Sequence, residues 1–262
     1  MSSVLYLLIY KVFRYRYTIV ADNLQKAFPS LNSLQKKRLI KAFYQHLCDL
    51  TLESLKGLGI KKEEIQKRYQ FINPALLNVE FEKGQSIIIL GSHYGNWEWG
   101  VLSVSLWLKH QVVGIYKPIK NKAIGDLFNQ NRKKWGLTLA PMAKTGRALI
   151  QKREKPAAFV FIADQSPSDV KNAHWLNFFN QRTAFHHGVD KIARRTNYPV
   201  YLFDIQRVKR GYYQVHFSLL CATPKNTADG EITSLYAKAL EETIKRQPAY
   251  WLWSHRRWKR SF

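Results

Sequence analysis

Apolar residues recur at helical spacing in the longest patterned segment of the chain. Between Asn32 and Gly57 they follow one another at steps of mostly three or four residues, at Leu34, Leu39, Ile40, Phe43, Leu47 and Leu50. This spacing puts them on one face of a helix, and Asn before such a segment and Gly after it are typical helix ends. We therefore expect an amphipathic helix over residues 33–56.

A different pattern begins at residue 86. Residues 86–90 read Ser-Ile-Ile-Ile-Leu, a continuous apolar run short enough for a buried strand. A turn between Gly91 and Gly95 and a helical stretch to residue 108 follow it. The order strand, turn, helix then repeats, with strands predicted over 111–116, 137–140 and 157–163 and helices over 123–135 and 145–152.

The last part of the chain predicts a hairpin and one more helix. Residues 200–207 and 212–219 are apolar strand-like runs on either side of Lys-Arg-Gly211, and residues 233–245 have helical character. Alternating strands and helices predict an α/β fold, with a central, largely parallel sheet flanked by helices. The chain of 262 residues is long enough for a single domain over residues 1–262.

The opening segment is apolar but short. A spanning helix needs about 20 apolar residues, whereas Lys11, Arg14 and Arg16 interrupt the run that starts at residue 4. We expect residues 1–20 to form an amphipathic, membrane-proximal helical region that lies on a membrane without crossing it. No basic leader or small-residue cleavage site marks a secretory signal peptide.

Charge narrows the class of partner. Lys and Arg number 42 against 18 Asp and Glu, a formal net charge of +24 that favours nucleic acid, phospholipid headgroups or acidic proteins. Basic residues concentrate in residues 109–155 and in the tail after Glu242, where Trp alternates with Arg and Lys. Amphipathic aromatic residues beside cations are typical of a membrane interface, so an anionic membrane surface is the expected partner.

His93 and Glu98 are the candidate catalytic pair. His93 follows the strand at 86–90, where ligands gather in open α/β sheets. The two side chains can meet if His93 lies in the turn before the helix. A carboxylate on one imidazole nitrogen leaves the other free to take a proton from an attacking hydroxyl, which favours acyl transfer without a metal.

The block Gly-Ser-His93-Tyr-Gly-Asn-Trp-Glu98, a His-x4-Glu motif, resembles the signature of the bacterial lipid A late acyltransferases, the lauroyl/myristoyl transferase family of the lysophospholipid-acyltransferase-like superfamily. Four further blocks resemble this family in the same order. They are Asn23-Leu-Gln-Lys-Ala-Phe-Pro29, Tyr116-Lys-Pro-Ile-Lys-Asn121 with the later Arg132, Ala163-Asp164-Gln165, and the ending Trp251-Leu-Trp-Ser-His-Arg-Arg-Trp258.

The resemblance implies a glycerolphosphate-acyltransferase-like fold and an enzyme on the cytoplasmic face of the inner membrane. It implies transfer of a fatty acyl group from acyl carrier protein or acyl-CoA to a hydroxyl of an envelope lipid, a lipid A precursor above all, with His93 and Glu98 as the dyad. Asn121, Arg132, Asp164 and Gln165 are implied as substrate-binding residues, with no metal and no cofactor. Asn121 and Arg132 could equally be structural hydrogen-bonding residues.

Two other functions compete with this hypothesis. A nucleic-acid-binding protein would use the same positive charge and aromatic residues, although no known nucleic-acid module is present. An acyl-thioester hydrolase would use the same dyad on water. Cys48 and Cys221 have no Cys-x-x-Cys partner, and His186 and His187 have no acidic residue at ligand spacing, so neither a disulfide framework nor a metal site is expected.

Overall fold

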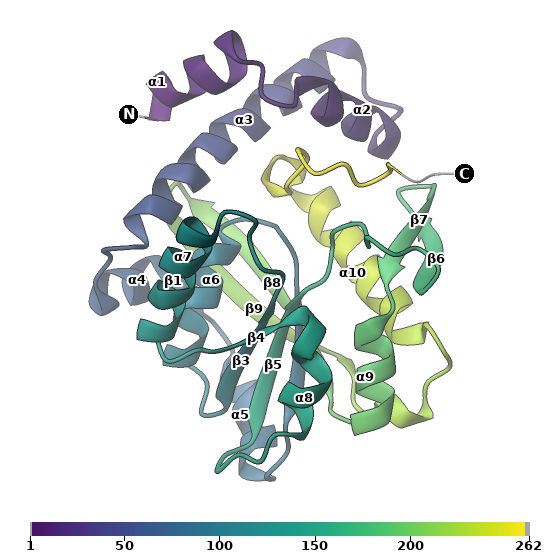
Figure 1. The fold of residues 1–262 in the computed structure, drawn as a ribbon. Coiled ribbons are helices and arrows are strands. Elements are labelled where there is room, and N and C mark those ends of the chain that lie inside the picture. The colour runs from purple at the N-terminus through teal and green to yellow at the C-terminus, as the bar shows by residue number, and fades with distance from the viewer. Residues whose placement is uncertain (1, 260–262) are drawn as a thin grey trace.

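A seven-stranded sheet forms the centre of the computed structural model, which describes residues 2–259 (Figure 1). Its strand order is β1-β9-β8-β2-β5-β3-β4. The strands are β1 Tyr69–Phe71, β2 Ile87–Gly91, β3 Gln111–Tyr116, β4 Thr138–Pro141, β5 Ala157–Ile162, β8 Val200–Lys209 and β9 Tyr212–Cys221. The five from β8 to β4 are mutually parallel, β9 is antiparallel to β8, and β1 pairs in parallel with β9. The predicted α/β fold with a mostly parallel sheet is confirmed.

Helices flank this sheet, with α4, α6 and α7 on the left in Figure 1 and α9 and α10 on the right. Their bounds are α1 Ser2–Tyr6, α2 Tyr17–Ala27, α3 Ser33–Lys56, α4 Lys62–Arg68, α5 Ala75–Glu82, α6 Trp97–Ser103, α7 Lys122–Lys134, α8 Thr145–Ile150, α9 Gly188–Thr196 and α10 Glu231–Arg246. A π-helical turn, η1 Leu7–Val12, continues α1. Short 3-10 turns lie at Val104–Leu106, Met142–Lys144, Pro224–Asn226 and Pro248–Tyr250.

The two strongest sequence patterns give the elements they predict. Helix α3 occupies residues 33–56 and begins with a capping box, in which the Asn32 side chain accepts from the Gln35 backbone N–H and the Gln35 side chain accepts from that of Asn32. Strand β2 is buried along its whole length, as a continuous apolar run requires between two layers of helices.

One hairpin has no counterpart among the predicted elements. Strands β6 Ala173–Phe178 and β7 Gln181–His186 pair as a separate antiparallel ribbon. Its two connecting residues, Phe179 and Asn180, have φ of 52° and 55°. Tight hairpin turns need positive φ, which Asn tolerates better than most residues, but Phe at the first position is an unusual turn residue. The usual sequence signal for a turn is therefore weak here.

Helices α1, η1 and α2 arch over the top of the molecule against α3 (Figure 1). Among residues 2–259, every helix is too short or too polar to traverse a bilayer. The expected helical structure of residues 1–20 is confirmed for α1, η1 and the start of α2. Several apolar side chains of this region face outward, with Phe13 73% exposed.

The Trp-rich tail lies in the core, contrary to the expectation that it faces a membrane. Trp251, Trp253 and Trp258 are each 5% exposed or less. The Asn23 amide donates to the backbone oxygens of Trp253 and His255, at 2.7 Å each, and so ties the tail to α2. Each indole ring gains more from burial of its large apolar area than it would from a half-exposed position. Sequence pattern alone does not separate the two environments.

Candidate active site

His93 lies in a tight turn between β2 and α6. The Asn96 side chain accepts from the Trp99 backbone N–H and caps α6. Gly95 takes φ of +58°, and a Cβ at this position would lie 2.7 Å from Cγ2 of Ile205. The Gly in the motif is therefore required both by backbone conformation and by the close approach of β8.

The carboxylate that holds the His93 ring belongs to Asp164. Strand β5 is parallel to β2 and pairs Gly91 with Ile162, so the residues after both strands emerge side by side. Oδ1 of Asp164 lies 2.7 Å from Nδ1 of His93, and Oδ2 accepts from the His93 backbone N–H at 3.0 Å. This fixes the imidazole at the carboxyl ends of the parallel strands, where the sequence placed it.

Asp164 is fully buried, and its second oxygen also accepts from Nε1 of Trp251 at 2.8 Å. Burial would raise the pKa of this carboxyl, but the neighbouring His93 imidazole and the hydrogen bonds from His93 and Trp251 hold the pKa below its ordinary value. The ionised carboxylate can only accept, so Nδ1 of His93 carries a proton and Nε2 has a free lone pair in the neutral ring.

Nε2 of His93 faces the side chain of Gln165, whose Nε2 lies 3.3 Å away. The Trp97 ring packs edge-on at 5.0 Å from the imidazole on another side. The side chain of His93 is 20% exposed. The imidazole is therefore held by Asp164 on its Nδ1 side, and on its Nε2 side it meets the Gln165 amide, which can donate to it.

Glu98 does not form the expected hydrogen bond with His93; it pairs with Arg132. Nε and Nη2 of Arg132 donate to the two Glu98 oxygens at 3.0 and 2.8 Å. Glu98 is the second residue of α6, which contacts α7, and its side chain meets Arg132 in the last turn of that helix. The pair is mostly buried, with side-chain exposures of 10% for Glu98 and 16% for Arg132.

Asn121 has the structural role that the sequence left open. Its side chain accepts from the Ile124 backbone N–H at 3.2 Å and caps α7, and the residue is exposed. It therefore helps to begin the helix that carries Arg132 toward Glu98.

The tail supplies site residues that the sequence did not single out. Tyr250 and Leu252 pair with the His93 turn through the backbone, since the Gly95 N–H donates to the Tyr250 oxygen and the Leu252 N–H donates to that of His93. Nε2 of His255 accepts from the Ser166 backbone N–H at 3.0 Å, and burial lowers the pKa of His255 to about 4. The neutral ring thus supports the loop after Gln165.

Arg257 is also part of this buried shell. It is 2% exposed, its guanidinium lies 4.2 Å from the centre of the Phe185 ring, and none of its three side-chain nitrogens has a hydrogen-bond partner among residues 2–259. Burial lowers its pKa to about 10, which still leaves it charged at neutral pH. Arg257 is therefore not available to a membrane surface, whereas Arg256 and Lys259 are exposed and Arg260 lies outside the described residues.

A second polar cluster lies where α9 and α10 begin. Nε2 of His187 is 3.1 Å from Asp229, and the ligand atoms of His187, Asp190 and Asp229 lie within 4.8 Å of one another. His187 therefore has an acidic partner that sequence spacing did not reveal. Asp190 already accepts from three backbone N–H groups at the start of α10, and Asp229 also pairs with Arg194. These bonds account for the cluster as structural.

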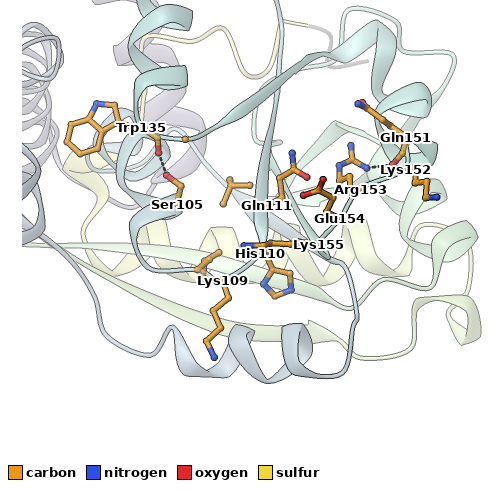
Figure 2. Close-up of a pocket in the computed structure, with 13 residues that line it drawn as sticks. Ser105, Lys109, His110, Gln111, Trp135, Gln151, Lys152, Arg153, Glu154 and Lys155 are labelled. Atoms are coloured by element: carbon orange, nitrogen blue, oxygen red, sulfur yellow. Dashed lines mark hydrogen bonds between the residues drawn. The ribbon is translucent and has the colours of Figure 1, made fainter.

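Figure 2 shows a large pocket, of about 540 Å³, around Lys109 to Gln111 and Gln151 to Lys155. It lies at the opposite end of the parallel strands from His93. Lys109 to Val112 and the Gln151 to Lys155 loop line it, at the points where β3 and β5 begin. Ligands of parallel sheets bind at the carboxyl ends of strands, and this pocket is at the other end. It is therefore separate from the site around His93.

One comparison identifies the family of the chain. A family model of the bacterial lipid A biosynthesis acyltransferases matches residues 5–260, nearly the whole chain. A search of curated proteins gives no match. The matched region contains the His93 turn, the Asp164 loop, Arg132 and the tail that closes around them. The chain belongs to the bacterial lipid A biosynthesis acyltransferase family.

Proposed function

We propose that the protein transfers a fatty acyl group from a thioester, carried by acyl carrier protein or coenzyme A, to a hydroxyl of a lipid A precursor. The observation that carries this proposal is the 2.7 Å contact between Nδ1 of His93 and the buried Asp164 carboxylate. It orients the ring and leaves Nε2 as the base, within a family of acyltransferases.

In the proposed reaction, Nε2 of His93 takes the proton of the acceptor hydroxyl as its oxygen attacks the thioester carbonyl carbon. The carbonyl oxygen becomes an oxyanion in a tetrahedral intermediate. When this collapses, the C–S bond breaks, the ester forms, and the imidazolium gives its proton to the leaving thiolate. Asp164 stabilises the imidazolium throughout by its negative charge.

Gln165 and Arg132 are the proposed substrate-binding groups. The Gln165 amide lies beside Nε2 of His93, the place where the reacting hydroxyl must arrive, and can yield to it. The Arg132 guanidinium is held by both Glu98 oxygens and can attract an anionic group of the substrate or the developing oxyanion. Glu98 acts in this scheme by positioning Arg132, and Asn121 by starting the helix that carries it.

The proposed site of action is the cytoplasmic face of the inner membrane, with the protein docked on anionic lipid. The exposed Phe13 and the exposed cations Arg14 and Arg16 support docking on a membrane surface. Apolar insertion together with positive charge gives the two signals that stable peripheral binding needs. The family match does not favour a nucleic-acid-binding protein.

The test is incubation of the protein with a purified lipid A precursor and a fatty acyl thioester of either acyl carrier protein or coenzyme A. The products are analysed by mass spectrometry. We expect an added acyl ester, formed in the wild type and lowered by roughly two to four orders of magnitude in His93→Ala. Free fatty acid formed equally with and without the acceptor would instead identify a thioester hydrolase. Normal turnover in a folded His93→Ala protein would refute the proposed base.

A further inference from the structure

A second basic pocket, of about 380 Å³, lies between the N-terminal helices and α3. Three aromatic residues and four basic residues line it: Tyr6, Tyr10, Tyr17, Lys11, Lys37, Arg38 and Lys41. They come from α1, η1, α2 and α3, so the pocket forms only when the N-terminal segment folds back onto α3. We call it the N-terminal pocket.

The tyrosine rings form a packed wall. The centre of the Tyr10 ring lies 5.1 Å from that of Tyr6, 6.2 Å from that of Tyr17 and 4.9 Å from that of the buried Tyr44. The Tyr44 hydroxyl donates to the Tyr15 backbone oxygen at 2.6 Å, which anchors the wall to α3. Within residues 2–259, the hydroxyls of Tyr6, Tyr10 and Tyr17 have no hydrogen-bond partner, so they remain available as donors.

The α3 cations of the N-terminal pocket are also free, whereas Nζ of Lys11 lies over the Tyr10 ring, 5.4 Å from its centre. None of its lining residues is acidic, and no carboxylate in residues 2–259 lies within ion-pair distance of Lys37, Arg38 or Lys41. The larger pocket in Figure 2 differs in this respect. Its Lys109 pairs with Glu82, its Arg153 donates to backbone oxygens, and Glu154 lines it. The N-terminal pocket is therefore the stronger anion site.

Exposed apolar side chains adjoin the N-terminal pocket on α1, on η1 and at Phe13, the residue after η1. Val4, Leu7, Leu8, Val12 and Phe13 are between 43% and 73% exposed. A soluble anion would leave them in water, whereas a bilayer would cover them. Tyrosine rings beside cations and apolar side chains match the boundary between lipid headgroups and acyl chains.

We propose that the N-terminal pocket binds the phosphate headgroup of one anionic phospholipid while the adjoining apolar residues enter the acyl-chain region of the bilayer. Lys37, Arg38 and Lys41 attract the phosphodiester, and the tyrosine hydroxyls donate to its oxygens. The inference deepens the proposed function and rests on its membrane docking. It adds a discrete, saturable lipid site that is separate from the acyl acceptor at His93.

The direct test is isothermal titration calorimetry of the purified protein with short-chain phosphatidylglycerol, kept below its critical micelle concentration. We expect one saturable site in the wild type. Lys37→Gln/Lys41→Gln should weaken it by about 25-fold, at about fivefold for each cation. The matched control, Lys61→Gln/Lys62→Gln, removes the same charge from two exposed lysines outside the pocket and should bind as the wild type does.

Titrations with other ligands and with one more variant distinguish a lipid site from a general anion site. Inorganic phosphate should bind much more weakly than phosphatidylglycerol, and short-chain phosphatidylcholine should bind weakly because its headgroup has no net charge. Tyr10→Phe, which keeps the ring and removes only the hydroxyl, should weaken phosphatidylglycerol binding several-fold. Equal binding of inorganic phosphate and phosphatidylglycerol, or equal loss in the two double variants, overturns the proposal.

Turnover on detergent-dispersed substrate distinguishes this proposal from the catalytic one. Lys37→Gln/Lys41→Gln should keep wild-type turnover there and lose it only when the acceptor is presented in anionic vesicles. Failure of acyl transfer with intact phosphatidylglycerol binding would refute the proposed function and leave the lipid site standing. An equal loss of turnover in detergent would show that the pocket serves the acceptor and would overturn the separate site.

Discussion

Asp164 holds His93 at 2.7 Å from a position 71 residues further along the chain, because β5 lies directly beside β2 in the sheet. The carboxylate in turn accepts from Trp251, which the tail brings back across the same edge. Three segments distant in sequence thus meet at one buried charge. Sheet topology therefore determines, as much as the His93 motif does, how the proposed base and the carboxylate that orients it are placed relative to each other.

Asp164→Asn should lower acyl transfer by roughly two to four orders of magnitude, because the neutral amide cannot stabilise the imidazolium that forms on His93. The change keeps side-chain volume, and donor binding should persist. Turnover and donor affinity measured on the same preparation would check this. Activity close to that of the wild type in a folded Asp164→Asn protein would show that His93 needs no charged partner.

Glu98 and Arg132 should behave as one unit. Glu98→Gln leaves a largely buried guanidinium without its carboxylate, and we expect a loss of about 2 kcal/mol in the free energy of unfolding together with reduced turnover. Arg132→Gln should cost a similar amount, and the double variant should cost clearly less than the sum of the two. Urea unfolding of the four proteins measures this coupling; strict additivity would mean that the pair is not an energetic unit.

The sequence predicted the strand before His93 and the turn that carries it, since these depend on neighbouring residues. It assigned the wrong hydrogen-bond partner to the imidazole, although Asp164 was among the implied substrate-binding residues. The reason is strand order: β5 inserts between β2 and β3, and local pattern carries no information on which parallel strands become neighbours. The buried tail was misplaced for a related reason, because Trp beside Arg suits an interface and a packed core alike.

His46 should make the fold sensitive to acid. It is buried in α3 against Tyr250, and this burial is the main reason that its pKa is lowered from 6.5 to about 3. The positive charge of Arg207 lowers the pKa further, by more than the negative charge of Asp49 raises it. A histidine whose pKa is lower in the folded state binds its proton preferentially when unfolded, so stability falls as pH drops from about 6.5 toward 3. At about pH 5 the loss from this one group is about 2 kcal/mol.

His46→Phe tests this linkage, because it keeps an aromatic ring against Tyr250 and removes the titrating group. The free energy of unfolding of the variant should vary less steeply between about pH 7 and pH 5 than that of the wild type, and the difference in slope should approach one bound proton near about pH 5. Urea unfolding at several pH values gives both slopes. Parallel slopes would mean that His46 is protonated in the folded protein or that another group causes the acid sensitivity.

The tail offers a final prediction, which separates exposed from buried cations within one short segment. Arg256 is exposed and Arg257 is buried on the Phe185 ring, so only the first can meet an anionic bilayer. The double change Arg256→Gln/Lys259→Gln should weaken binding to anionic vesicles by about 25-fold at low salt, at about fivefold for each cation. Arg257→Gln should leave vesicle binding within about twofold and instead change stability, because the effect of a lost charge falls off with distance from the membrane surface. Vesicle co-sedimentation at rising ionic strength, paired with urea unfolding, measures both. A salt-dependent binding loss in Arg257→Gln as large as that in the double variant would show that the tail opens on the membrane.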